Sequence, residues 1–147
     1  FDLQTNGQMI KKCWKHMNKI HKNIDVIRVS MDAGTEETYK IVRAPGDWNR
    51  LIANIAYLNS VRYDYNFKVH SDFVVQKINY KEIPKYIRLA ENLGIDQINL
   101  QKITDWGTTE NFDQCAIWKE THAEYPAYSE IIKNIRNERV QLGNIQV

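Results

Sequence analysis

Short apolar runs alternate with longer amphipathic stretches along this chain. Runs rich in β-branched residues predict strands over residues 3–5, 25–31, 67–75 and 95–103. Apolar positions that recur every three or four residues predict helices over residues 9–20, 35–42, 83–93 and 125–140, and one that begins after Asp47. This alternation indicates α/β class, with a parallel sheet built from about four βα units.

Residues that favour helix ends mark several boundaries. Thr35, followed by two glutamates, is suited to cap the helix that begins there, and Asp47 is suited to cap the next one. Gly94 is placed to end the helix over residues 83–93. The four strands joined by such helices would form half of a barrel or a small open sheet.

Composition narrows the class of protein. With 147 residues, 43% of them hydrophobic, residues 1–147 are expected to form a single domain. No apolar run approaches the ~20 residues of a membrane span. Twenty Lys and Arg oppose eighteen Asp and Glu, so we expect no nucleic-acid partner, although lysines gather in residues 11–22.

The two cysteines and four histidines show no spacing typical of a metal site or a disulfide framework. We therefore expect no metal ligands in this chain and a reducing, cytoplasmic location. Cys13, on the apolar face of its predicted helix, is expected to be a small core residue. Cys115 is expected on the solvent side of a polar loop.

Polar residues follow each predicted strand. In parallel sheets the carboxyl ends of the strands meet at one edge, where ligands bind. That edge should therefore gather polar side chains from four strands, which are Thr5, Asn6, Ser30, Asp32, Gln76, Asn79, Gln101 and Lys102.

The motifs at these strand ends resemble those of the radical S-adenosylmethionine (SAM) superfamily. Thr5-Asn6-Gly7, then Ser30-Met31-Asp32 with Thr38-Tyr39 and Arg43, is similar to its "TNG" strand followed by an "SxD…TY…R" strand and helix. Residues 73–84 and 89–94 resemble the next βα unit of SPASM-type maturases. The resemblance covers roughly residues 3–125.

This resemblance implies part of a (β/α) barrel, a partial TIM barrel, that binds SAM and a [4Fe–4S] cluster. The parent enzyme would cleave SAM reductively and abstract hydrogen from a substrate with the resulting 5′-deoxyadenosyl radical. The CxxxCxxC loop that holds the cluster and the "GGE" strand are absent from the sequence. We therefore expect a carboxyl-terminal part of such a barrel, truncated upstream of Phe1 and inert by itself.

The resemblance also assigns SAM-binding candidates, each of which has a purely structural alternative. Ser30 and Asp32 would contact the ribose or the amino group, or else Ser30 packs and Asp32 caps a helix. Arg43 would grip the SAM carboxylate, or else pair with Glu36 or Glu37. Gln76 and Asn79 would bind adenine or ribose, or else cap the helix that follows. Gln101 completes the set.

Two classes of function remain open from the sequence. The first is the SAM-binding half of a radical SAM enzyme, whose substrate is a peptide or a small molecule. The second is a non-catalytic α/β module that binds a ligand or partner through the same strand ends. Exposed strands at the edges of the sheet would in either case favour self-association.

Overall fold

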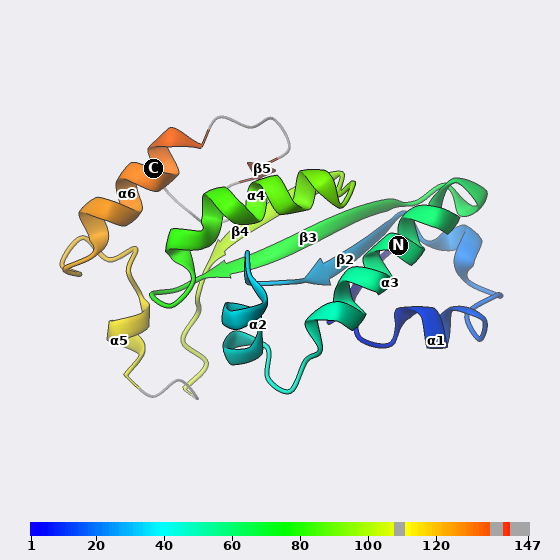
Figure 1. The fold of residues 1–147 in the computed structure, drawn as a ribbon, viewed down its shortest axis with the longest axis horizontal. Helices are drawn as coiled ribbons and strands as arrows, with labels where there is room; N and C mark the ends of the chain where they lie inside the picture. Colours follow the sequence, from blue (N-terminus) through cyan, green and yellow to red (C-terminus); the bar gives the residue numbers. More distant parts are fainter. Residues whose placement is uncertain (108–110, 136–139, 142–147) are drawn as a thin grey trace.

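A computed structural model describes residues 1–107, 111–135 and 140–141 of the chain. Its centre is a parallel sheet of five strands in the order β1-β2-β3-β4-β5 (Figure 1). The strands are β1 (Asp2–Thr5), β2 (Val26–Ser30), β3 (Lys68–Val75), β4 (Gln97–Lys102) and β5 (Val140–Gln141). The parallel α/β fold predicted from the alternation of elements is confirmed.

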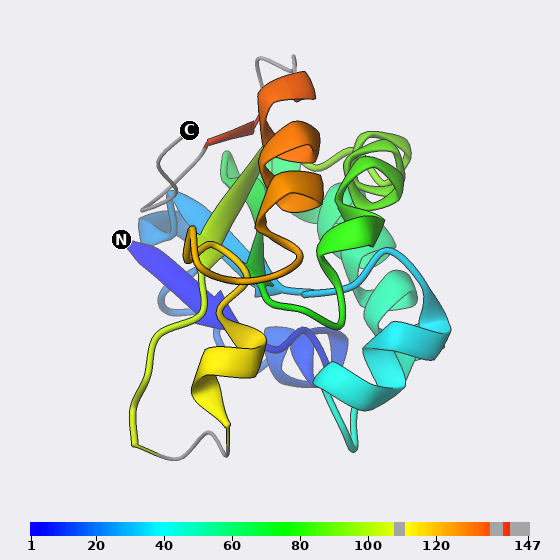
Figure 2. The same cartoon turned by 90° about the vertical axis from the view of Figure 1, so that its left-hand side faces the viewer.

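The connecting segments are mainly helical. They are α1 (Ile10–Trp14), η1 (His21–Asn23), α2 (Glu36–Val42), α3 (Trp48–Tyr65), η2 (Tyr80–Glu82), α4 (Ile83–Asn92), α5 (Phe112–Cys115) and α6 (Tyr125–Asn134). Figure 2 shows α2, α3 and α4 together on one side of the sheet. That side holds the core, where Leu51 and Leu58 of α3 and Tyr86 of α4 are fully buried.

The faces of the sheet follow from the strand register. Leu3 aligns with Ile27, and Ile27 with Val69, on the face that the helices cover. The alternate positions point to the opposite face, because side chains alternate along a strand. Most of these positions are polar in the four neighbouring strands β1 to β4, and the polar members include Gln4, Arg28, Ser30, His70, Asp72, Asn99 and Gln101.

The predicted caps at two helix starts are confirmed. The Thr35 hydroxyl accepts a hydrogen bond from the Thr38 N–H, and the Asp47 carboxylate accepts one from the Arg50 N–H. Gly7 lies in the turn after β1 with φ +77°, and a Cβ there would collide with Leu51. The "TNG" glycine thus lets β1 turn directly against α3.

The predicted helix over residues 9–20 is wrong in length. Helix α1 ends at Trp14, after which the chain folds back so that the His21 ring stacks on Trp14 with centroids 4.1 Å apart. His21 Nε2 also lies 2.8 Å from the Trp14 carbonyl oxygen. Cys13 is exposed, so its assignment to the core is wrong too. Burial of the Trp14 ring outweighs continuation of the helix.

The carboxyl-terminal helix is also shorter than predicted. Helix α6 ends at Asn134, and Ile135 is extended. Residues 136–139 of the predicted helix lie outside the described residues. Val140 pairs with Ile98 in a short fifth strand, where the sequence pattern predicted only four. A β-branched residue beside the edge of β4 gains more from sheet pairing than from a helical turn.

Candidate functional site

The segment after β2 is built around Asp32. This residue adopts a left-handed conformation with φ 57°, which Asp tolerates better than most residues. Its carboxylate accepts a hydrogen bond of 2.7 Å from the Val74 N–H and forms an ion pair with Arg43. The carboxyl ends of β2 and β3 and the end of α2 are thereby joined at one carboxylate.

This ion pair contradicts the structural alternative predicted for Arg43, whereas SAM binding by Arg43 stays a prediction. Its guanidinium pairs with Asp32 and not with the glutamates of α2, where Glu36 pairs instead with Lys40. Burial raises the pKa of Asp32, while the nearby Arg43 charge and the Val74 hydrogen bond lower it. The pKa remains above its usual range, so the Arg43 charge offsets only part of the desolvation of Asp32.

The guanidinium of Arg43 can bind a further anion besides Asp32. Its side chain is 28% exposed, and its Nε atom is buried without a hydrogen-bond partner among the described residues. A hollow of about 420 Å³ next to it is lined by residues that include Asn6, Gln8, Tyr39 and Arg50. A planar anion such as a carboxylate matches the donors of a guanidinium in this position.

The side chain of Asn79 forms hydrogen bonds to backbone groups of neighbouring segments. It is fully buried, and its amide N–H groups donate to the carbonyl oxygens of Asp32 and Val74, both at 2.9 Å. Its side-chain oxygen accepts from the Gln76 N–H. Although Asn79 precedes the η2 turn, its side chain makes no capping bond there. The structure therefore gives Asn79 the task of fixing the loop after β3 against Asp32.

The other predicted site residues differ in their surroundings. Ser30 is buried at the end of β2, aligned with Asp72, and its hydroxyl has no hydrogen bond within the described part of the chain. Gln76 is half-buried after β3, and Gln101 is exposed on the polar face of β4. Thr5 and Asn6 accept hydrogen bonds from the N–H groups of Gly7 and Gln8, so both shape the turn after β1.

A second carboxylate, that of Glu82 at the end of η2 just before α4, stabilises this site. Glu82 accepts hydrogen bonds from the Gly34 N–H at 2.8 Å and from the hydroxyls of Thr35 and Thr38, both at 2.7 Å. Burial raises the pKa of Glu82, but the bonds from Thr38, Thr35 and Gly34 lower it below its usual range. Glu82 thus holds the start of α2, whose far end carries Arg43.

The sequence analysis missed Asp72 and Asn99, which lie in the middle of their strands. The Asn99 amide donates to the Asp72 carboxylate at 2.8 Å, and both side chains are buried on the polar face. Gln4 donates to the same carboxylate at 3.4 Å. The alternation of polar residues at positions 68, 70 and 72 and at 97, 99 and 101 could have placed them on one face of the sheet, although it does not reveal their burial.

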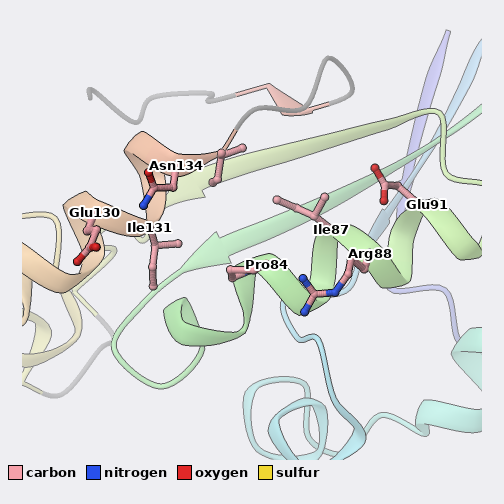
Figure 3. Close-up of a pocket in the computed structure, with 8 residues that line it drawn as sticks. Pro84, Ile87, Arg88, Glu91, Glu130, Ile131 and Asn134 are labelled. Carbon is pink, nitrogen blue, oxygen red and sulfur yellow. The ribbon is translucent and has the colours of Figure 1, made fainter.

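A groove of about 420 Å³ lies between α4 and α6, with Ile87 and Ile131 on its two sides and Arg88 and Glu130 at its rim (Figure 3). None of the strand-end residues lines it. It is therefore separate from the site built around Asp32.

The described part of the chain holds no cluster of candidate metal ligands and no apolar helix of membrane-spanning length. No three His, Cys, Asp or Glu side chains gather there as metal ligands would. Cys13 and Cys115 are both free thiols. No helix among the described residues is long and apolar enough to cross a membrane.

Comparison with known proteins supports the resemblance seen in the motifs. Probable GTP 3′,8-cyclases of Saccharolobus islandicus and Saccharolobus solfataricus are 31% identical to the chain over 98 residues. That stretch is 67% of this chain but 30% of each relative, so the chain matches less than a third of their length. No family profile matches the chain.

A solved structure shares the fold. The structure of anSMEcpe with bound AdoMet and Kp18Cys peptide superposes with a TM-score of 0.53 over 71% of this chain and 28% of the other, at 16% identity. AnSMEcpe and the cyclases are both radical SAM enzymes. The comparisons therefore support a radical SAM origin for this chain, and its parallel sheet matches part of the anSMEcpe fold.

Proposed function

We propose that this chain is the SAM-binding part of a radical SAM enzyme. The observation that carries the proposal is the partly exposed Arg43 guanidinium, which is oriented by Asp32 and lines a hollow of about 420 Å³ at the strand ends. SAM carries a carboxylate that such a guanidinium can bind. The sequence similarity to radical SAM cyclases supports the same assignment.

The residues present fit SAM in distinct roles. Arg43 would hold the carboxylate, and the free hydroxyl of Ser30 would bind the ribose or the amino group. Gln76 and Gln101 would offer amides to adenine or ribose from the ends of β3 and β4. Asp32 and Asn79 are already bonded within the protein, so we assign them the positioning of Arg43 and of the loop after β3.

The residues present do not fit a [4Fe–4S] cluster. A site with three protein thiolates needs more cysteines than the two in this sequence, and Cys13 and Cys115 lie on separate elements. In the family the cluster supplies the electron that cleaves SAM. The chain's own residues therefore bind and orient SAM, and we propose that the 147 residues alone do not cleave it.

Binding is tested by titrating SAM into the isolated chain and measuring its affinity by calorimetry. Arg43→Met should weaken binding at least tenfold, because a charged bidentate contact is lost. Arg88→Met, on the outer side of α4, is the matched control and should leave the affinity unchanged. Equal affinity for the wild-type chain and Arg43→Met would refute the role of Arg43.

Catalysis is tested separately. After anaerobic iron–sulfur reconstitution and reduction, the isolated chain should release no 5′-deoxyadenosine. A longer form of the protein that includes a CxxxCxxC loop should release it. Release by the isolated chain would contradict the proposal that it is inert, and a chain that never binds SAM would favour a non-catalytic module that binds another ligand.

The substrate is proposed only as a class. One relative is named for action on GTP, and the structural neighbour was solved with a peptide, so a small molecule and a peptide are both proposed for the parent enzyme. Free thiols in Cys13 and Cys115 support a reducing, cytoplasmic setting, which we also propose.

A further inference from the structure

The carboxylate of Asp72 is buried in the centre of the sheet without a cationic partner. Asp72 is 4% exposed and lies at the fifth position of the eight-residue strand β3. Its carboxylate accepts hydrogen bonds from two neutral amides, Asn99 at 2.8 Å and Gln4 at 3.4 Å. No Lys, Arg or His of the described residues lies within ion-pair distance of it.

This environment differs from that of the other buried aspartate at the site. Asp32 has the guanidinium of Arg43 beside it, which offsets part of the cost of burial. An ionised carboxylate removed from water destabilises a protein unless a charge or several strong donors compensate it. A positively charged group bound to the Asp72 carboxylate would therefore offset part of the cost of its burial.

Two neighbouring groups on the same face are also without partners. His70, two residues before Asp72, is 6% exposed, and its Nδ1 atom has no hydrogen bond among the described residues. The Ser30 hydroxyl, aligned with Asp72 on β2, likewise has none. Ser30 therefore lies beside Asp72, and His70 precedes Asp72 along β3, on the face opposite the core that α3 and α4 cover.

The position of Asp72 connects this face to the strand ends. Its backbone carbonyl oxygen accepts hydrogen bonds from the N–H groups of Met31 at 3.1 Å and Asp32 at 3.4 Å. A group bound at the carboxylate would lie next to the segment proposed to hold SAM. A metal ion is not the indicated partner, because no three metal-ligating side chains gather in the described part of the chain.

We propose that Asp72, oriented by Asn99, binds an ammonium or guanidinium group of the substrate on the polar face of the sheet. This inference rests on the proposed function, since it adds the chemistry of the substrate to a SAM-binding site. The bound cation supplies the positively charged partner that the Asp72 carboxylate lacks among the described residues, and the Ser30 hydroxyl, aligned with Asp72, accepts a further N–H of the same cation.

The test uses butylguanidinium as the probe and butylurea as its uncharged isostere. Each is titrated into the isotopically labelled chain while the carboxyl carbon of Asp72 and the amide of Asn99 are followed by NMR. Saturable shifts at both positions, with at least tenfold tighter binding of butylguanidinium, are expected. Asp72→Asn should abolish them, whereas Asp64→Asn, an exposed aspartate in α3, should not.

The possible results separate this inference from the proposed function. The inference is overturned if the wild-type chain binds butylguanidinium and butylurea with equal affinity. It is also overturned if the chemical shift of Asp72 in the wild-type chain does not change, and neither result depends on a variant. SAM is titrated into the same sample, and its effect is read at Ser30 and Arg43. SAM binding without guanidinium binding refutes the Asp72 site alone, whereas guanidinium binding without SAM binding refutes the proposed function and leaves Asp72 as a cation site.

Discussion

At the scale of residues, Asp32 joins three segments through one side chain. Asp32→Ala would leave the Val74 N–H without its acceptor and Arg43 without its partner, and would place alanine at φ 57°. We expect a loss of about 2 kcal/mol in the free energy of unfolding. Asp32→Asn keeps an acceptor and tolerates the left-handed backbone, so about 1 kcal/mol is expected. Urea unfolding of both variants checks the order, and equal losses would contradict it.

The hydrogen bond between Tyr86 and Ser71 provides a second test at this scale. The Tyr86 hydroxyl donates to Ser71 Oγ at 2.6 Å, and both residues are fully buried between α4 and β3. Tyr86→Phe should cost about 1–2 kcal/mol, since it leaves the serine hydroxyl without its partner. Adding Ser71→Ala should cost less than it does in the wild-type chain. Strictly additive losses in urea unfolding would show that the bond contributes nothing.

The residues that sequence analysis could find are those that end strands. Ser30 and Asp32 were predicted as site residues because polar residues after parallel strands gather at one edge of the sheet. Arg43, at the end of α2, was predicted from the motif resemblance instead. The bonds of Asn79 to the backbone of Asp32 and Val74 could not be foreseen, because they depend on the separation of two loops. Asp72 was missed because its burial depends on the neighbouring strands β2 and β4, which no local pattern reveals.

At the scale of elements, Glu82 couples α4 to the start of α2. The pKa of Glu82 is lowered in the folded protein, so its charge stabilises the fold above the unfolded pKa of about 4.3. This contribution is lost as the pH falls through the lower, folded pKa. The free energy of unfolding at neutral pH should therefore be higher for the wild-type chain than for Glu82→Gln. This difference should decrease as the pH is lowered.

The measurement is urea unfolding of both chains at several pH values between neutral and about pH 3. Glu120→Gln, at an exposed position outside the helices, is the control for a change of net charge. A difference between the wild-type chain and Glu82→Gln that stays constant with pH would show that the bonds from Gly34, Thr35 and Thr38 do not depend on ionisation.

Elements whose ends carry local signals were predicted well, and those ended by tertiary contacts were not. Helices α2 and α3 begin after the predicted caps, Thr35 and Asp47. Helix α1 carries an apolar repeat that continues past Trp14, yet the helix stops where His21 stacks on that ring. An apolar repeat in the sequence predicts which residues are buried. It does not predict whether a continued helix or a turn back onto the core buries them better.

At the scale of the whole molecule, β1 forms one edge of the sheet, as Figure 2 shows. An apolar hollow beside this edge is lined by Leu3, Met9, Ile10, Cys13, Trp14 and Met17 among others. An open strand edge next to apolar side chains is a template for pairing with another chain. The edge therefore supports the proposal that the isolated chain associates with itself.

Self-association is tested with two variants that add the same charge at different places. Leu3→Lys places an ammonium group beside the β1 edge, whereas Ile41→Lys places one on the exposed surface of α2, where Ile41 is 64% exposed. Light scattering should show a mass that rises from micromolar to millimolar concentration for the wild-type chain and Ile41→Lys. Leu3→Lys should stay monomeric, because a buried ammonium would oppose pairing at that edge. A wild-type chain that is monomeric throughout would refute the proposal, and equal association of both variants would place the contact elsewhere.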